Sequence, residues 1–199
     1  MTTLKLQALL NQRQERILLS LKKLSFLTRT QLSRIHNLGG KRNTNRILAQ
    51  LEPYMNSYRE GYDTVYYLNS EGREYVDAKK KLRKNQYVGH ILLGNEFFIF
   101  KGKPSYWRRE IKVGDSKASI ICDVLYKEHG KMCILEIDRT QKMSVNREKI
   151  KTYSEIASRV KDFPQVIWLT CTDHRRKQLT KTCAEAGLTC KVYTLEDIT

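Results

Sequence analysis

The segment KRNTNRILAQLE, residues 41–52, decides the fold of the first part of this 199-residue chain. Placed on a helix at about 100° per residue, its side chains separate into an apolar face and a polar face. The apolar face holds Thr44, Ile47, Leu48 and Leu51, and the polar face holds Lys41, Arg42, Asn45, Arg46 and Gln50. We therefore predict an amphipathic helix, which Pro53 ends because proline cannot continue a helical hydrogen-bond ladder.

Two further helices are expected before this segment. Residues 12–26 carry apolar side chains at helical spacing. Thr28 and Gln31 then form a capping-box pattern, in which two side chains satisfy free amides at the start of a helix. The short helix that they open ends at residues 37–40, which contain two consecutive glycines.

A hairpin and a fourth helix are expected after the segment. Two strand-like runs, at about 54–58 and 64–68, flank a loop with glycine, as a tight hairpin requires. A helix then opens at Asn69. The order helix, helix, helix, hairpin, helix predicts a winged helix-turn-helix domain at about residues 11–80.

The third helix of such a domain enters the major groove of double-stranded DNA, while the hairpin touches the flanking backbone. Lys and Arg side chains reach phosphates, and Arg, Asn and Gln can also read base edges. We therefore expect double-stranded DNA as the partner and name these candidate DNA-binding residues: Lys41, Arg42, Asn45, Arg46, Gln50, Arg59 and Arg29. Two alternatives stay open, namely an ordinary solvated helix face and a winged helix that binds another protein.

The charge of the whole chain favours a polyanionic partner. It holds 37 Lys and Arg against 21 Asp and Glu, which gives a formal net charge of +16. Such a charge attracts nucleic acid or an anionic membrane surface. Because no stretch approaches the ~20 apolar residues that a membrane span needs, we expect DNA as the partner and no membrane.

Residues 77–84, DAKKKLRK, are the expected domain boundary. Helices and one hairpin precede this basic segment, and alternating strands and helices follow it. We therefore expect a DNA-binding domain at residues 1–80 and an α/β domain at residues 81–199.

The cysteines indicate a cytoplasmic protein. None of the five belongs to a C-x-x-C pair, and most lie in apolar runs. We therefore expect reduced thiols, no zinc site, no disulfide framework and no cofactor in a cytoplasmic protein that associates with the nucleoid or a plasmid.

Strand and helix patterns alternate in the second half of the chain. The expected elements are a helix at 86–100, strands at 106–113, 118–127 and 131–138, a helix at 145–160, a strand at 166–172, a helix at 174–186 and a strand at 189–195. This order is the core layout of restriction-endonuclease-like nucleases. The expected fold class is therefore α+β, with a winged helix-turn-helix followed by an α/β domain of that layout.

Three acidic residues lie where such nucleases carry their catalytic acids. Asp123 falls on the second strand, and Glu136 and Asp138 fall on the third, where period-two geometry puts them on one face of the sheet. All three are candidate catalytic residues, and Asp123 with Glu136 would hold Mg²⁺ if the domain is a nuclease.

The lysine that such nucleases need on the third strand is missing, because Asp138 occupies its position. Three nearby lysines could replace it: Lys142, Lys149 and Lys151. The alternative is that the acids pair with local arginines such as Arg139 and Arg147. We favour a nuclease-like scaffold without activity over a metal-dependent endonuclease.

The stretch LEIDRT, residues 135–140, followed by a basic helix containing REKIKTY, residues 147–153, resembles the replication-relaxation family of Gram-positive bacteria and their plasmids. Further matches are residues 67–72, His90 and residues 166–172 with the two arginines that follow. The resemblance extends from about Gln14 to Gln178.

This resemblance implies a DNA-binding accessory or regulatory factor for replication, relaxation or transfer of a plasmid or mobile element. Replication or relaxation proteins of the same element would be its protein partners. A transcription repressor of the element would use the same DNA-binding residues and remains an alternative. Symmetric DNA sites would favour a homodimer, although no heptad pattern indicates one.

Overall fold

The computed structural model describes residues 3–199, with side chains from Asn11 onward. The chain forms two compact units, Met1–Asn95 and Glu96–Thr199. Helices and a five-stranded mixed sheet together make the fold α+β, as expected. No helix among the described residues is long and apolar enough to cross a membrane.

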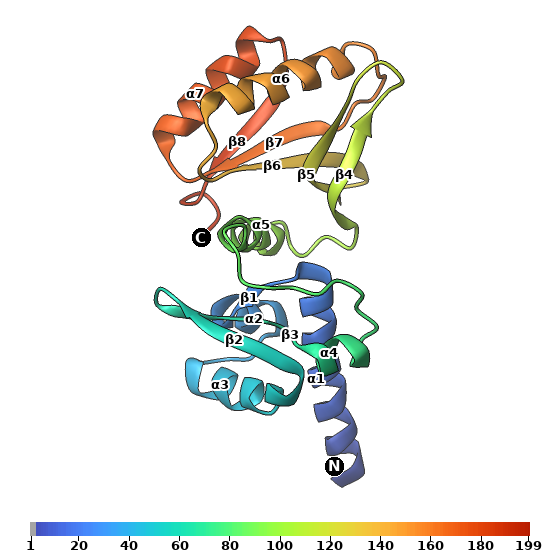
Figure 1. The fold of residues 1–199 in the computed structure, drawn as a ribbon, viewed down its shortest axis with the longest axis vertical. Coiled ribbons are helices and arrows are strands. Elements are labelled where there is room, and N and C mark those ends of the chain that lie inside the picture. Colours follow the sequence, from blue (N-terminus) through green and yellow to red (C-terminus); the bar gives the residue numbers. More distant parts are fainter. Residues whose placement is uncertain (1–2) are drawn as a thin grey trace. The chain divides into compact units, whose positions relative to one another are not determined.

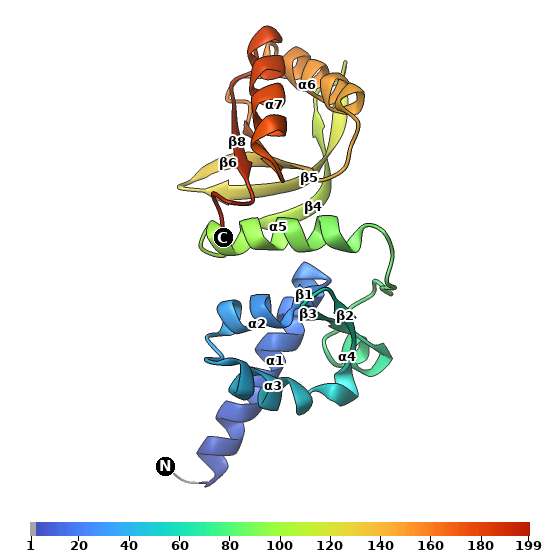
Figure 2. The same cartoon turned by 90° about the vertical axis from the view of Figure 1, so that its left-hand side faces the viewer.

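The first unit contains helices around a small antiparallel sheet with strand order β1-β3-β2 (Figures 1 and 2). Its elements are α1 (Thr3–Leu24), β1 (Leu27–Thr28), α2 (Arg29–His36), α3 (Lys41–Ala49), the 3-10 turn η1 (Glu52–Tyr54), β2 (Met55–Glu60), β3 (Asp63–Leu68), α4 (Ser70–Tyr75) and the first part of α5 (Val88–Phe100). The expected order of three helices, a hairpin and a helix is present.

Local sequence signals explain the helix starts in this unit. The Thr28 hydroxyl accepts the backbone N–H of Gln31 at 3.1 Å, and the Gln31 side chain accepts the backbone N–H of Thr28 at 3.1 Å. The predicted capping box is therefore confirmed. Asn37 ends α2 in the left-handed conformation, with φ 52°, which asparagine tolerates better than most residues.

The boundary between the two units falls inside α5, later than the sequence predicts at residue 80. Val88 packs with Phe26 and Val65 in a small core of the first unit. The Asn95 amide is fully buried and donates to the carbonyl oxygens of Leu24 and Phe26 at 3.2 and 2.6 Å. The basic segment 77–84 therefore lies within the first unit, because the helix after it completes the core of that unit.

The second unit is a five-stranded sheet with order β4-β5-β6-β7-β8. Its strands are β4 (Trp107–Gly114), β5 (Ser119–Glu128), β6 (Lys131–Asp138), β7 (Gln165–Thr170) and β8 (Cys190–Thr194), and its helices are α6 (Met143–Ala157) and α7 (Asp173–Glu185). The β4–β5 and β5–β6 pairs are antiparallel, whereas β6–β7 and β7–β8 are parallel. The two parallel connections run through α6 and α7.

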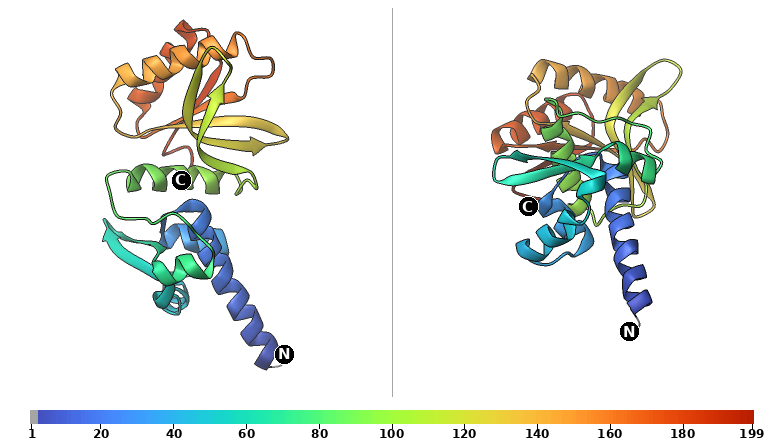
Figure 3. Two further views of the ribbon diagram at one scale, coloured as in Figure 1. Left: turned by 45° about the vertical axis from the view of Figure 1, so that its right-hand side comes forward. Right: turned by 60° about the horizontal axis from the view of Figure 1, so that its bottom comes forward.

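Helices α6 and α7 cover the same face of this sheet (Figures 1 and 3). Ile134 from β6, Trp168 from β7, Ile150 from α6 and Leu179 from α7 share one buried cluster. Because side chains alternate along a strand, the residues of β6 that share the face of Ile134 also lie beneath α6 and α7. Glu136 and Asp138 are those residues.

Candidate functional site

The exposed face of α3 is the first candidate site. Thr44, Ile47 and Leu48 are buried, and the polar residues predicted to face outward are exposed: Lys41, Arg42, Asn45, Arg46 and Gln50. Thr44 fixes the helix, because its hydroxyl donates to the Ser33 hydroxyl of α2 at 3.2 Å. The polar face of α3 therefore faces solvent over its whole length.

The start of α3 is electropositive for two reasons. Gly40 precedes the helix, so no side chain caps its first amides, and the first turn contains no acidic residue. Unsatisfied amides at a helix start carry a positive partial charge, which favours anions. Within the described part of the chain, the Lys41 and Arg42 side chains form no hydrogen bond or ion pair, while Arg46 donates to Asn43 at 2.9 Å.

The structure places the two other predicted DNA-binding arginines differently. Arg59 is exposed on β2, next to the hairpin turn that carries the 98% exposed Tyr62. Arg29, at the start of α2, forms an ion pair with Asp63 at 3.2 Å, and its side chain is only 13% exposed. Arg59 is thus available to a ligand, whereas the Arg29 guanidinium already ties α2 to the hairpin.

Asp123 and Glu136 form the second candidate site, in the other unit. The register between β5 and β6 pairs Val124 with Leu135, which brings Asp123 beside Glu136 on adjacent strands. A carboxylate oxygen of Asp123 accepts the backbone N–H of Ile137 at 2.7 Å. The Glu136 side chain is fully buried.

Two side chains of α6 hold the Glu136 carboxylate. The Lys149 ammonium lies 2.5 Å from one oxygen, and the Tyr153 hydroxyl donates to the other. Lys149 and Tyr153 are four residues apart, so they lie one above the other on the same helix face. The structure therefore selects Lys149, and not Lys142 or Lys151, as the lysine beside the predicted acids.

Burial raises the pKa of Glu136 to about 7, and the charge of Asp123 acts in the same direction, while Lys149 and Tyr153 oppose it. Burial disfavours the charged form of Lys149, but Glu136 and Asp123 outweigh burial and raise the pKa of Lys149. Lys149 therefore remains an ammonium ion that interacts with both carboxylates. The electrostatic coupling places Asp123, Glu136 and Lys149 in one cluster.

Asp138 pairs with the start of α7 instead of with Lys149. Its carboxylate lies 2.9 Å from Nε of Arg175, and the same guanidinium donates to the carbonyl oxygen of Gln141 at 2.9 Å. Neither carboxylate oxygen of Asp138 accepts a hydrogen bond from the described residues. The alternative that the acids pair with Arg139 and Arg147 is wrong, since the partners are Lys149 and Arg175 on the inward faces of the two covering helices.

Sequence reasoning missed Tyr153 and Arg175 as members of this site. Tyr153 looks like an ordinary core residue of an amphipathic helix, and Arg175 like one of many basic residues. The described residues contain no group of three or more His, Cys, Asp or Glu side chains placed to hold a metal ion. A pair of carboxylates nevertheless suits Mg²⁺, which proteins often hold with one or two carboxylates together with substrate phosphates.

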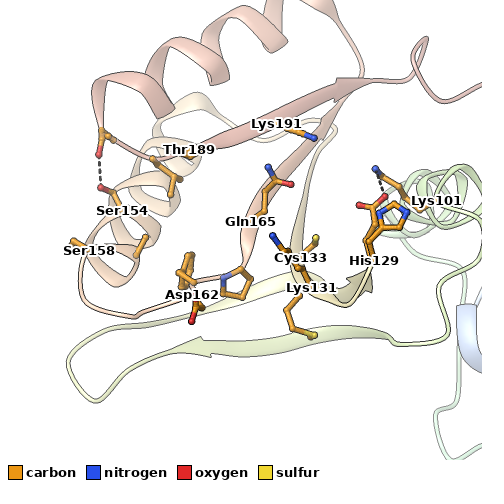
Figure 4. A pocket seen from close by; sticks show the side chains of 18 residues that line it. Lys101, His129, Lys131, Cys133, Ser154, Ser158, Asp162, Gln165, Thr189 and Lys191 are labelled. Atoms are coloured by element: carbon orange, nitrogen blue, oxygen red, sulfur yellow. Dashed lines mark hydrogen bonds and ion pairs between the residues drawn. The ribbon is translucent and has the colours of Figure 1, made fainter.

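A cavity of about 1330 Å³ lies elsewhere in the second unit, at the starts of its parallel strands (Figure 4). Lys131, Gln165 and Lys191 line it from β6, β7 and the start of β8, and Ser154 and Ser158 line it from the end of α6. None of the predicted site residues lines this cavity.

Comparisons with known proteins show what the chain is similar to. Among the solved structures that match, two have the following low similarity. Protein VC1899 from Vibrio cholerae is 14% identical to this chain, with a TM-score of 0.39. The match covers 100% of this chain and 55% of VC1899. Can2 from Sulfobacillus thermosulfidooxidans, in complex with cyclic tetra-adenylate, is 12% identical to this chain, with a TM-score of 0.32. That match covers 96% of this chain and 51% of Can2.

This chain therefore spans about half the length of those two proteins. A comparison with curated proteins finds no match. The replication-relaxation family model matches residues 18–166, which is 149 of the 199 residues. The chain belongs to the replication-relaxation family.

Proposed function

We propose that the first unit is a winged helix-turn-helix domain that binds double-stranded DNA, with α3 in the major groove and the β2–β3 hairpin on the flanking backbone. Family membership suggests a role in replication or relaxation of a plasmid or mobile element. Within that role, the protein is a DNA-binding accessory or regulatory factor. A transcription repressor of the element would use the same DNA-binding residues and would differ only in the DNA site that it binds.

The exposed face of α3 is the observation that carries this proposal. It presents Lys41, Arg42 and Arg46 to phosphates, and Asn45 and Gln50 to base edges. Its uncapped, acid-free first turn adds the positive end of the helix dipole. A solvated helix face with no ligand would not need this combination, since basic residues at a helix start oppose the dipole.

Salt dependence of DNA binding tests the proposal. The full chain should bind a fluorescein-labelled duplex with an affinity that falls steeply with salt, at a slope of about −0.9 in log K per log salt for each phosphate contact. Fluorescence anisotropy between about 50 and 200 mM salt measures the slope. Absence of binding at the lowest salt, or an affinity that does not change with salt, would overturn the proposal.

A metal-dependent endonuclease of restriction-endonuclease-like fold is the second candidate function. The observation that favours it is Lys149, which reaches Glu136 from α6 and thus replaces the lysine missing at position 138. Asp123 and Glu136 would hold Mg²⁺, which supplies Lewis acidity and a more acidic bound water. Lys149 would hold the Glu136 carboxylate in place and present a positive charge beside it.

This second candidate predicts nicking of supercoiled plasmid that requires Mg²⁺ or Mn²⁺. Gel electrophoresis should show the nicked form with the wild-type chain and at least about a hundredfold less with Glu136→Ala, because loss of a group that stabilises the transition state typically reduces rates by factors of this order. Glu155→Ala, which removes an exposed glutamate of the same helix outside both proposed sites, is the matched control and should retain nicking. A wild-type chain that binds the plasmid but leaves it intact at high protein and metal concentrations would reject an endonuclease.

A further inference from the structure

We infer that the second unit carries its own DNA-binding surface, formed by the β6–α6 connection and the first turns of α6. We call it the α6 surface and define it by four cations: Arg139, Lys142, Arg147 and Lys151. The inference rests on the proposed DNA binding for the identity of the ligand, but it uses none of the residues of α3. The ligand it takes is the phosphate backbone of duplex DNA.

The four cations of the α6 surface are free to meet a ligand. All four side chains are exposed, and none forms an ion pair within the described part of the chain. The buried acids beneath them are already matched, Glu136 by Lys149 and Asp138 by Arg175. Because each buried acid has its own cation, the outward cations are left without internal counter-charges.

The local sequence makes this strip strongly positive. Between Arg139 and Lys151, Glu148 is the single acidic residue, against four exposed cations. Arg147 and Lys151 are four residues apart and therefore share one face of α6. Asn146 and Ile150 are buried on the inner face of the same turns, so the helix cannot rotate those cations inward without exposing its core.

The start of α6 resembles the start of α3 in its electrostatics. Lys142 occupies the cap position, no side chain caps the first amides, and the first turn contains no acid. In contrast, α2, α4 and α7 each have a side-chain cap, from Thr28, Asn69 and Thr172. Cations at a helix start oppose the helix dipole and reduce stability. Helix stability therefore does not explain Lys142 at the cap position, whereas binding of phosphate does.

The position of the α6 surface in the fold also suits a ligand. Arg139 and Lys142 follow the carboxyl end of β6, which pairs in parallel with β7. Ligands of open α/β sheets bind outside the carboxyl ends of the parallel strands. Contacts to phosphates carry no base information, so the α6 surface should add affinity without sequence preference.

The test compares two variants of the full chain that lose the same charge. The first replaces the α6 surface (Arg139→Gln, Lys142→Gln, Arg147→Gln and Lys151→Gln). The control replaces four exposed lysines elsewhere in the second unit (Lys112→Gln, Lys117→Gln, Lys127→Gln and Lys161→Gln). Binding of a fluorescein-labelled random-sequence duplex is measured over a range of salt. The slope of log K against log salt should shrink by up to about 3.6 in the first variant, at about 0.9 per lost contact, and by less than about 1 in the control.

Equal slopes for the two variants would overturn the α6 surface while leaving α3 as the DNA-binding element. Failure of the wild-type chain to bind duplex at any salt would instead overturn the proposed function. Unchanged thermal melting of both variants establishes that the fold is intact. A charge-preserving variant, Arg139→Lys with Arg147→Lys, should keep the wild-type slope, and a reduced slope there would contradict a purely electrostatic phosphate contact.

Discussion

Replacing Arg42 and Arg46 with glutamate is expected to weaken duplex binding by roughly a hundredfold to ten-thousandfold, because two charge-assisted contacts of about 1.5–3 kcal/mol each are lost. Both side chains are exposed on α3 and can turn toward a phosphate or a base edge. In the variant, two carboxylates would face the phosphate backbone, so repulsion adds to the loss. Anisotropy titration at low salt measures the effect.

This double variant should fold normally. Arg42 lies in the first turn of α3, where an acidic residue is favoured by the helix dipole. The Arg46 side chain contributes one exposed hydrogen bond to Asn43, and changes at exposed positions usually shift stability by less than about 0.5 kcal/mol. Lys112→Glu with Lys117→Glu is the matched control, because it changes the net charge equally on the second unit. If both variants lose the same affinity, α3 is not the recognition helix.

Replacing Lys149 with methionine is expected to lower the free energy of unfolding by about 3–5 kcal/mol near neutral or higher pH, because it leaves a buried carboxylate without its cation. Methionine has nearly the same length as lysine, so packing against the sheet is retained and the charge is what changes. Glu136 is fully buried and has Lys149 at 2.5 Å. Urea denaturation followed by circular dichroism measures the loss.

The loss should depend on pH in a defined direction. The folded-state pKa of Glu136 is about 7, above its ordinary value of 4.5, so this group's contribution to stability is full below about pH 4.5 and is lost as the pH rises through about 7. Removing Lys149 raises that folded-state pKa further. The destabilisation should therefore be smallest near pH 5, where Glu136 takes up a proton, and largest near pH 8.

Two further variants separate charge from packing in this prediction. Adding Glu136→Gln to Lys149→Met removes the uncompensated charge and should recover most of the lost stability, because a buried ion pair exchanged for neutral groups is often nearly neutral in energy. Lys151→Met, on the exposed side of α6, should change stability by less than about 0.5 kcal/mol. A loss that is equal at pH 5 and pH 8 would show that Glu136 carries no buried charge.

Patterns that act over three or four residues could be read from the sequence. The capping box of Thr28 and Gln31 depends only on neighbouring backbone geometry, and it is present as predicted. The two faces of α3 follow from the helical period, because Ile47 and Leu48 must be buried on one side of the helix. The residue types at positions 135–140 indicate the replication-relaxation family without reference to the fold, and the family match includes them.

The partners of the charged groups were decided only by the tertiary structure. Three lysines follow the acids along the chain, and only the packing of α6 on the sheet decides that Lys149 faces Glu136 while Lys151 faces solvent. Arg175 reaches Asp138 because α7 starts beside the end of β6. These pairs join residues far apart in sequence, so no local period predicts them.

By itself, then, the sequence determined the amphipathic α3 with its basic face, the α+β class and the family, since all three follow from residue type and spacing. The tertiary structure alone decided that Arg29 is paired with Asp63 and that the first unit extends to Asn95. It also decided which cations remain exposed to solvent and unpaired with a buried acid. The physical reason is that burial forces each buried acid to take a cation from a covering helix, and the cations left over stay exposed to solvent.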